Sequence, residues 1–151
     1  MTKVSLPLDA TLPRLLARNA RDRGDAPAMR EKSMGIWRTL TWSAYDELVR
    51  DFALGLAALG FKRGDVLAVI GDNRPRLYAA QLAAQCLGGL PVPLYQDAAG
   101  DELAYVLEHA EAVIVVAEDQ EQVDKILAIR DRLPKLAAIV FEDLQIGRAH
   151  V

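Results

Sequence analysis

The sequence is short of the residues that most often carry metal-binding or redox chemistry. Among its 151 residues there is one cysteine, Cys86, and there are two histidines. One cysteine cannot form an internal disulfide, which fits a reducing cytoplasm. We expect Cys86, in an apolar stretch, to be a small buried side chain and not a reactive thiol. We expect a structural role for His109 near the end of a helix, because it has no partners at metal-ligand spacing.

Basic charge and long apolar runs are also scarce. The net charge of −3 and the isoelectric point near 5.4 give no indication of a basic stripe for nucleic acid. The longest apolar run, Phe52 to Phe61, is too short to cross a bilayer, and the N-terminus lacks the apolar core of a signal peptide. With 52% hydrophobic and 26% charged residues, the composition predicts a soluble, cytoplasmic globular domain.

Motifs for hydrolysis, metal binding and redox chemistry are missing as well. HExxH, GxSxG and CxxC do not occur. Gly55 to Lys62 superficially resembles the phosphate-binding pattern GxxxxGK, but Phe61 takes the lysine position. Gly55 also lies inside a predicted helix instead of after a strand, where a phosphate cradle needs it. The sequence therefore assigns no catalytic, no cofactor-binding and no metal-binding residue.

The N-terminal part of the chain does contain clear structural patterns. Thr11 can cap a first helix, which Gly24 ends. Two extended runs, Ala28 to Lys32 and Ile36 to Leu40, predict a β-hairpin in which Gly35 takes a positive φ angle.

A long helix is predicted to begin at Thr41 or Ser43 and to stop at Gly60. Its apolar residues follow helical spacing, which predicts one continuous stripe packed on a sheet. The stripe consists of Tyr45, Leu48, Val49, Phe52, Leu56 and Leu59. Trp37, Trp42 and Tyr45 lie close together in sequence, and we expect them to pack in the core or the hairpin and not to stack on bases.

Beyond Gly60, apolar strands alternate with amphipathic helices, which predicts right-handed βαβ crossovers. Wholly apolar strands are usually buried on both faces, as in parallel sheets. The expected fold class is therefore α/β, with a mainly parallel sheet, flanking helices and a peripheral β-hairpin. The predicted strands are Val66 to Ile70, Leu90 to Leu94, Ala112 to Ala117 and Ala137 to Phe141, and the predicted helices are Arg76 to Leu87, Asp101 to Ala110 and Gln120 to Arg132.

Two loop segments invite a functional interpretation. Gly71 to Pro75 follows the first apolar strand, at the edge where ligands of open α/β sheets bind. Its aspartate and asparagine favour a turn, and Pro75 favours a helix start, so we interpret the segment as a turn. Gly88 and Gly89 indicate close backbone packing of a helix end on the sheet. Pro91 and Pro93 predict imperfect pairing of the strand that contains them.

Three blocks of the sequence resemble a known family. They are WRTLTWSAYDELV (Trp37 to Val49), LGFKRGDVLAVIGDNRPRLY (Leu59 to Tyr78) and AQCLGGLPVPLYQD (Ala84 to Asp97). In that order and spacing they are similar to the N-terminal region of AMP-forming acyl-CoA synthetases, the carboxylate–CoA ligases. The resemblance covers roughly Leu12 to Phe141, and it implies an incomplete N-terminal part of a larger adenylate-forming fold.

The resemblance implies a reaction whose machinery this sequence lacks. Such ligases make an acyl-adenylate from ATP and pass the acyl group to CoA. They need a Ser/Thr/Gly-rich loop followed by a lysine, Mg²⁺, a ribose-binding aspartate and a second lysine in a C-terminal domain. We therefore expect ATP, CoA and Mg²⁺ to bind the intact enzyme and none of them to bind this fragment. Pro91 to Ala112 and Glu118 to Leu127 look most like bacterial long-chain fatty acid ligases, which implies a fatty acid substrate.

These features predict an inactive N-terminal fragment of a long-chain fatty acid–CoA ligase, in which residues 1–145 form the N-terminal portion of the AMP-binding domain. A self-contained, non-enzymatic α/β binding module stays open, as does a fragment of a ligase for another carboxylic acid. Ile146 to Val151 is predicted to be a non-native tail, because one set of codons that encodes it, ATC GGA AGA GCA CAC GTC, matches the start of a common sequencing-library adapter. An ordinary polar tail stays open as the alternative. We expect the fragment to self-associate through uncovered apolar surface, and peripheral membrane contact stays open.

Overall fold

The computed structural model describes residues 10–141 of the chain. The predicted tail from Ile146 to Val151 lies outside the described residues. The chain divides into two compact units, and the boundary falls between Glu47 and Leu48, inside a long helix.

The first unit contains a helix and a β-hairpin, α1 (Leu12–Arg23), β1 (Pro27–Ser33) and β2 (Ile36–Thr41), followed by the start of α2 (Trp42–Ala58). The Thr11 hydroxyl oxygen caps α1 by accepting a hydrogen bond from the Arg14 backbone N–H at 3.4 Å. The two strands pair antiparallel and form a sheet of their own. Met34 and Gly35 both have positive φ, 49° and 80°, as a tight two-residue hairpin turn requires.

The aromatic residues of the first unit do not form the expected packed cluster. Tyr45 is buried, and the Trp42 ring lies under the Arg23 guanidinium at 4.9 Å. Trp37, by contrast, is 66% exposed on β2. The expectation that Trp37 packs was wrong, because the hairpin is a two-stranded sheet of its own and β2 is exposed over most of its length.

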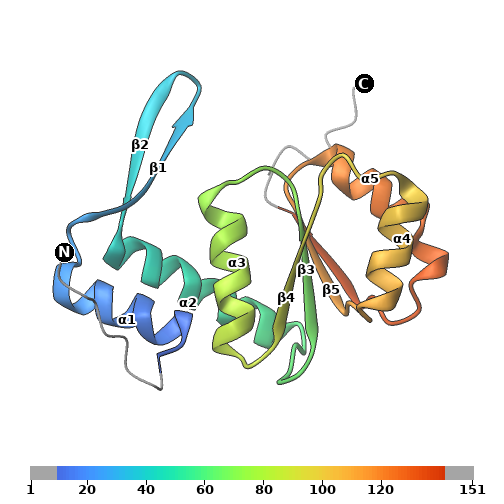
Figure 1. Cartoon of the computed structure of the whole chain (residues 1–151), viewed down its shortest axis with the longest axis horizontal. Helices are drawn as coiled ribbons and strands as arrows, with labels where there is room; N and C mark the ends of the chain where they lie inside the picture. The colour runs from blue at the N-terminus through green and yellow to red at the C-terminus, as the bar shows by residue number, and fades with distance from the viewer. Residues whose placement is uncertain (1–9, 142–151) are drawn as a thin grey trace, which may run out of the picture. The chain divides into compact units, whose positions relative to one another are not determined.

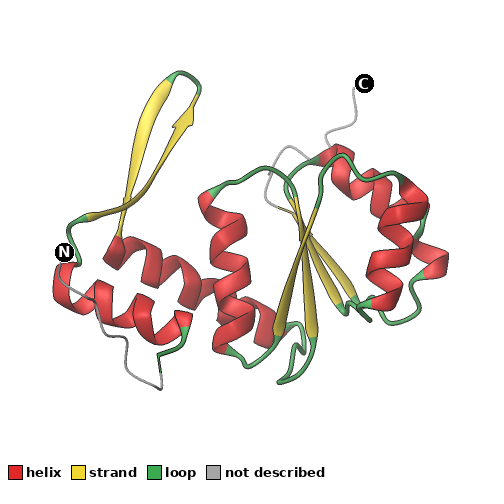
Figure 2. Cartoon of the chain, viewed as in Figure 1, coloured by secondary structure: helices red, strands yellow, loops and turns green. Residues whose placement is uncertain are grey.

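The second unit is built on a parallel sheet, which confirms the predicted fold class. Its strand order is β4-β3-β5-β6, and each neighbouring pair is parallel. Figure 2 shows these strands in yellow between two sets of helices. The strands are β3 (Val66–Ile70), β4 (Leu90–Leu94), β5 (Ile114–Ala117) and β6 (Ala138–Phe141), and the helices between them are α3 (Pro75–Cys86), α4 (Gly100–His109) and α5 (Gln120–Ala128).

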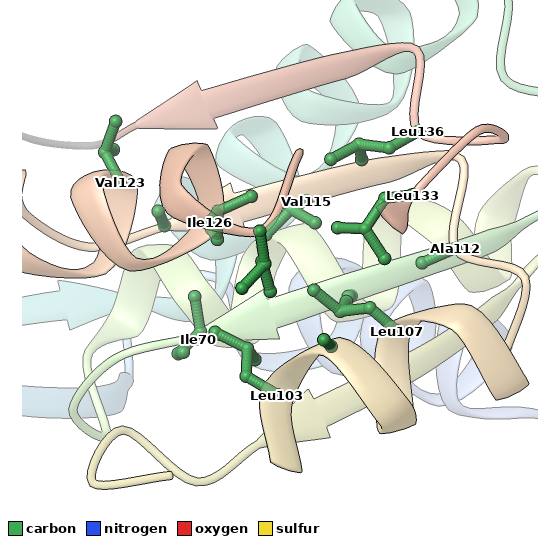
Figure 3. Close-up of a cluster of buried hydrophobic side chains, with 13 residues drawn as sticks. Ile70, Leu103, Leu107, Ala112, Val115, Val123, Ile126, Leu133 and Leu136 are labelled. Atoms are coloured by element: carbon green, nitrogen blue, oxygen red, sulfur yellow. The ribbon is translucent and has the colours of Figure 1, made fainter. Parts of the chain in front are cut away.

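Helices cover the two faces of this sheet in a doubly wound arrangement. Helix α3 lies on one face, and α4 and α5 lie on the other (Figure 1). The main core fills the space between the sheet and the helices α4 and α5 (Figure 3). Residues on one strand alternate between the two faces, so that Ala68 and Ile70 belong to this core while Leu67 and Val69 face the side of α3.

The last predicted helix is shorter than expected. Helix α5 ends at Ala128, and Arg130–Arg132 forms a separate 3-10 turn. The Arg130 guanidinium donates to the carbonyl oxygen of Leu133 at 2.8 Å and also to that of Leu136. These hydrogen bonds fix a tighter turn that buries Leu133 and Leu136, so tertiary packing ends the helix before its apolar pattern does.

The outer strands of the sheet differ in their free edges. Pairing of β4 with β3 is continuous from Leu90 to Leu94, so the predicted interruption by Pro91 and Pro93 does not occur. The Leu90 N–H points inward and donates to the Asp65 carbonyl oxygen at 2.9 Å. Because strand residues alternate, Pro91 and Pro93 face the outer edge, where a missing N–H leaves the ladder intact.

Within residues 10–141, no helix is both long enough and apolar enough to cross a bilayer.

Candidate functional site

The sheet has a topological switch point between β3 and β5. From β3 the chain crosses through α3 to β4 on one side, and then returns through α4 to β5 on the other side of β3. Open α/β sheets bind their ligands in the crevice at such a point, outside the carboxyl ends of the two strands. In this chain that crevice lies between Gly71, which follows β3, and Glu118, which follows β5.

The Glu118 side chain occupies the crevice. Its residue is only 7% exposed, and its backbone N–H continues the sheet by donating to the Ile70 carbonyl oxygen at 3.0 Å. One carboxylate oxygen accepts a short hydrogen bond from the Asp72 backbone N–H. The other forms an ion pair with Nε of Arg74 at 2.5 Å. An internal carboxylate therefore takes the position that a ligand anion takes in many related sheets.

Gly71 lets the loop approach this carboxylate. Its φ angle is 146°, which disfavours any side chain. A Cβ at this position would lie 2.7 Å from a carboxylate oxygen of Glu118 and 2.9 Å from Cδ1 of Leu77. Only glycine fits between the end of β5 and the first turns of α3.

The rest of the loop leads directly into α3. Pro75 is the first residue of the helix, and the Tyr78 hydroxyl donates to the side-chain oxygen of Asn73 at 3.0 Å. The Arg74 N–H donates to the Asp72 carbonyl oxygen at 2.8 Å. These contacts confirm the interpretation of Gly71 to Pro75 as a turn that starts a helix.

The polar groups at this crevice bind one another. The Asp72 N–H and the Arg74 guanidinium are donors that suit a phosphate group, but Glu118 engages both of them. An incoming triphosphate would have to displace a buried carboxylate and would be repelled by its charge. In this structure the two donors at the switch point are therefore bound by a side chain of the chain itself.

Glu118 is the functionally informative residue that sequence reasoning missed. A usable signal was its place directly after a wholly apolar strand, opposite Gly71 at the end of the neighbouring strand. The Glu118 carboxylate and the Asp72 N–H are 46 residues apart in sequence, so their hydrogen bond leaves no local sequence pattern.

Other residues singled out in the sequence fall into three cases. Cys86 is the last residue of α3 and is exposed, so its predicted burial was wrong. His109 lies in the last turn of α4 and stacks on Tyr105, with ring centroids 5.8 Å apart. A Cβ at Gly89 would clash with the Phe61 ring and lie 2.8 Å from the Asp65 carbonyl oxygen, which confirms close packing.

The amino-terminal edge of the sheet carries a different ion pair. Lys135 Nζ lies 2.7 Å from a carboxylate oxygen of Glu111. Its hydrogen bond, and then its charge, lower the pKa of the Glu111 carboxyl group. A hollow of about 200 Å³ beside this pair is lined mainly by apolar residues such as Leu107 and Leu136. Residues 10–141 contain no cluster of three or more histidine, cysteine or acidic residues that could hold a metal ion.

Comparison with known proteins places these features in context. The family model for AMP-binding enzymes matches residues 16–148. Among curated proteins, the long-chain-fatty-acid–CoA ligase ACSBG2 of Xenopus laevis is 32% identical over 136 residues, which are 90% of this chain and 18% of that protein. ACSBG2 of Rattus norvegicus is 32% identical over 131 residues, which are 20% of that protein. The chain thus spans about a fifth of these relatives.

Solved structures of CoA ligases share the fold. A fatty acyl CoA synthetase of Mycobacterium tuberculosis aligns with a TM-score of 0.80 at 23% identity, over 87% of this chain and 26% of that one. The anthranilate CoA ligase AuaEII aligns with a TM-score of 0.79 at 22% identity, over 91% of this chain and 26% of that one. At these identities the structures support the fold alone.

Proposed function

The chain belongs to the AMP-binding enzyme family, and from this we propose that it is the N-terminal part of a long-chain fatty acid–CoA ligase. The intact ligase would join a fatty acid to ATP, giving an acyl-adenylate and pyrophosphate. It would then transfer the acyl group to the thiol of CoA and release AMP. ATP, CoA and Mg²⁺ are the proposed co-substrates and metal of that intact enzyme, whose proposed location is the cytoplasm.

One observation carries the choice of acid. The chain is 32% identical over 136 residues to a ligase for long-chain fatty acids. Fold alone does not distinguish the acids, because an anthranilate ligase has a similar structure. The sequence similarity therefore supports fatty acid as substrate, and the shared fold supports the broader ligase class.

We infer that this chain acts as scaffold and that the reacting groups belong to the remainder of the ligase. Glu118 fills the crevice that an α/β sheet offers to a phosphate, and no residue was assigned to catalysis from the sequence. The matched relatives are about five times as long as this chain. Residues 1–145 would then be the N-terminal portion of the AMP-binding domain.

The experiment that tests the proposal uses the intact protein. The genomic reading frame in which residues 1–145 occur is expressed, and pyrophosphate and AMP are measured with a long-chain fatty acid, CoA and Mg²⁺. We expect product formation that needs all three additions together with ATP. Acetate and benzoate serve as matched acids without a long chain.

The outcomes separate the parts of the proposal. Activity with benzoate or acetate, but not with a long-chain acid, would contradict the fatty acid assignment and leave the ligase class standing. No carboxylate-dependent release of pyrophosphate from a folded, intact protein would contradict both. A reading frame that stops at codon 145 would support the non-enzymatic binding module.

A further inference from the structure

The Glu118 carboxylate is held as a bound carboxylate ligand would be held. The Asp72 backbone N–H donates to one of its oxygens, and Nε of Arg74 lies 2.5 Å from the other. Carboxylates bind strongly where both oxygens have a donor and one donor is charged. Both donors belong to the loop after β3, whereas the carboxylate comes from the residue after β5. The two donors and their occupant are therefore separate parts of the chain.

The donors are also held in place by contacts that do not involve the carboxylate. The Arg74 backbone N–H donates to the Asp72 carbonyl oxygen at 2.8 Å, and the Tyr78 hydroxyl donates to the side-chain oxygen of Asn73 at 3.0 Å. The backbone N–H of Glu118 is fixed separately, by its hydrogen bond to β3. A site that keeps its shape without an occupant binds one at little ordering cost. Shortening the Glu118 side chain should therefore leave the two donors in position.

The charges around the crevice suit an anion with a single negative charge. The Arg74 guanidinium supplies one positive charge, and the Glu118 side chain that faces it is 9% exposed. A buried charge needs a partner of opposite sign. Asp72, whose N–H is the second donor, brings a further carboxylate into the loop. A dianion would be repelled by that carboxylate, so a monoanion fits best.

The size of the site follows from the chemistry of glutamate. Beyond Cβ, its side chain consists of one methylene group and a carboxylate, which are the carbon and oxygen atoms of acetate. A Cβ at Gly71 would lie 2.4 Å from Cβ of Glu118 and 2.7 Å from a carboxylate oxygen, so the wall on this side is close. The Arg74 side chain is 51% exposed, which gives a small molecule a way in. Glu118→Ala would therefore leave a space that matches acetate.

We propose that the crevice is a recognition site for a small monocarboxylate, that Glu118 fills it from within, and that acetate occupies it when Glu118 is shortened to alanine. The acetate oxygens take the hydrogen bond of the Asp72 N–H and the ion pair of Arg74. A long-chain fatty acid is not this ligand, because the space ends one methylene group beyond the carboxylate. The inference does not rest on the proposed function, because every group in it belongs to the described residues.

Chemical rescue of Glu118→Ala tests the proposal. Unfolding of the 151-residue chain is followed by circular dichroism at neutral pH, in sodium acetate and in sodium chloride at equal concentrations. The wild type, whose site is filled, is the control for general effects of the salts on stability. Acetamide, which has the shape of acetate without its charge, is the second control. If the 151-residue chain does not unfold cooperatively, the same titration of the intact protein decides.

Acetate should stabilise Glu118→Ala in a saturable way, with a dissociation constant on the order of 10 mM for so small a ligand. At ten times that concentration, the folding equilibrium constant should be about elevenfold higher than in sodium chloride. The wild type should respond alike to the two salts, and acetamide should have no effect. An equal response of the wild type and Glu118→Ala to acetate would overturn the proposal. A variant that stays unfolded in acetate would overturn it too.

A second substitution tests whether the named donors hold the ligand. Arg74→Met, added to Glu118→Ala, should weaken acetate binding at least about tenfold, because the charged donor is lost. Arg132→Met is the matched control, since its guanidinium pairs with Asp101 at 2.7 Å. The amide resonance of Asp72 should also shift during an acetate titration of Glu118→Ala in NMR spectra. Rescue that survives Arg74→Met, or an Asp72 amide that does not shift, would contradict the assigned site.

The choice of acid tests the size and the charge of the site. Propionate is one methylene group longer than acetate and should bind Glu118→Ala more weakly. In Glu118→Gly, which lacks Cβ as well, propionate should bind more tightly than acetate. The same order in both variants would overturn the size argument, and stronger rescue by sulfate would identify a general anion site instead. Fatty acid activation by the intact protein is measured separately, so its absence would contradict the proposed function and leave this inference in place.

Discussion

At the carboxyl edge of the sheet, the Glu118 carboxylate binds one backbone N–H and one guanidinium from the loop after β3. Both donors come from the loop that starts α3, so one side chain ties together the ends of β3 and β5 and the start of a helix. The arrangement uses phosphate-type donors to stabilise the fold. A residue whose position suggests ligand binding thus acts as an internal ligand.

Removing this carboxylate should destabilise the chain without loss of the sheet. For Glu118→Ala we expect the free energy of unfolding to fall by about 1–3 kcal/mol, because the Asp72 N–H and the Arg74 guanidinium lose their partner. Glu118→Gln keeps an acceptor oxygen and should lose less. Urea unfolding followed by circular dichroism measures both. A loss in Glu118→Gln equal to that in Glu118→Ala would show that the hydrogen bond to Asp72 contributes nothing.

Gly71 and Gly64 provide a matched pair for the effect of close packing. Both have positive φ, 146° and 88°, but a Cβ at Gly64 would meet no atom within 4 Å. Gly64→Ala should therefore cost about 1 kcal/mol through backbone strain alone. Gly71→Ala adds a clash with Glu118 and Leu77 and should cost about 2–4 kcal/mol. Equal losses in chemical denaturation would contradict the packing that we describe around Glu118.

Side chains were harder to predict than backbone at this scale. The glycine-rich passage at Gly88 and Gly89 was correctly interpreted because glycine has few uses other than close approach or positive φ. Cys86 and Trp37 were wrongly expected to be covered, since burial depends on which helix face or hairpin face meets another element. Glu118 was missed because its hydrogen-bond partner Asp72 lies 46 residues away in sequence.

At the scale of helices and strands, the sequence was sufficient for most of the second unit. Wholly apolar runs such as Val66 to Ile70 predicted parallel strands, and they pair in parallel. Where a proline or a glycine marks the end of a helix, as in α3, the predicted and observed ends agree within a residue or two. Helix α5 was predicted too long, because the hydrogen bonds of Arg130 to two carbonyl oxygens are tertiary information.

The start of α5 offers a test of local capping. The Asp119 carboxylate accepts a hydrogen bond from the Gln122 backbone N–H at 3.0 Å. Asp119→Ala should lower the free energy of unfolding by about 1 kcal/mol, whereas Asp119→Asn should stay close to the wild type, since asparagine is an equally good cap. Thermal unfolding measures the difference. If both variants unfold like the wild type, this cap does not limit stability.

At the scale of the whole molecule, the fold could be predicted and the site could not. The strand order places a ligand crevice between β3 and β5 by a general rule of open α/β sheets, and this is where the structure places Glu118. An apolar groove along α2, with Val140 of β6 as its other wall, was visible in the sequence only as a wide apolar stripe. Which part of a stripe stays uncovered depends on the position of β6, which no local pattern gives.

The whole chain should not bind nucleotide. Calorimetric titration of the 151 residues with Mg-ATP is expected to give no heat of micromolar binding, because the phosphate-type donors at the switch point are engaged by Glu118. The intact protein under the same conditions is the positive control. A micromolar heat of binding in the 151-residue chain would contradict the structural interpretation of the crevice.

The difference between the two sheet edges also has a consequence for protein synthesis. Strand β4, whose outer edge lacks N–H groups at Pro91 and Pro93, leaves the ribosome before β6. The edge that is exposed for longer is therefore the one that cannot recruit a foreign strand. On the other side of the sheet, the outer edge of β5 stays free until β6 is made and pairs with it, so this is the side on which a growing chain can pair with its neighbours on the same messenger RNA.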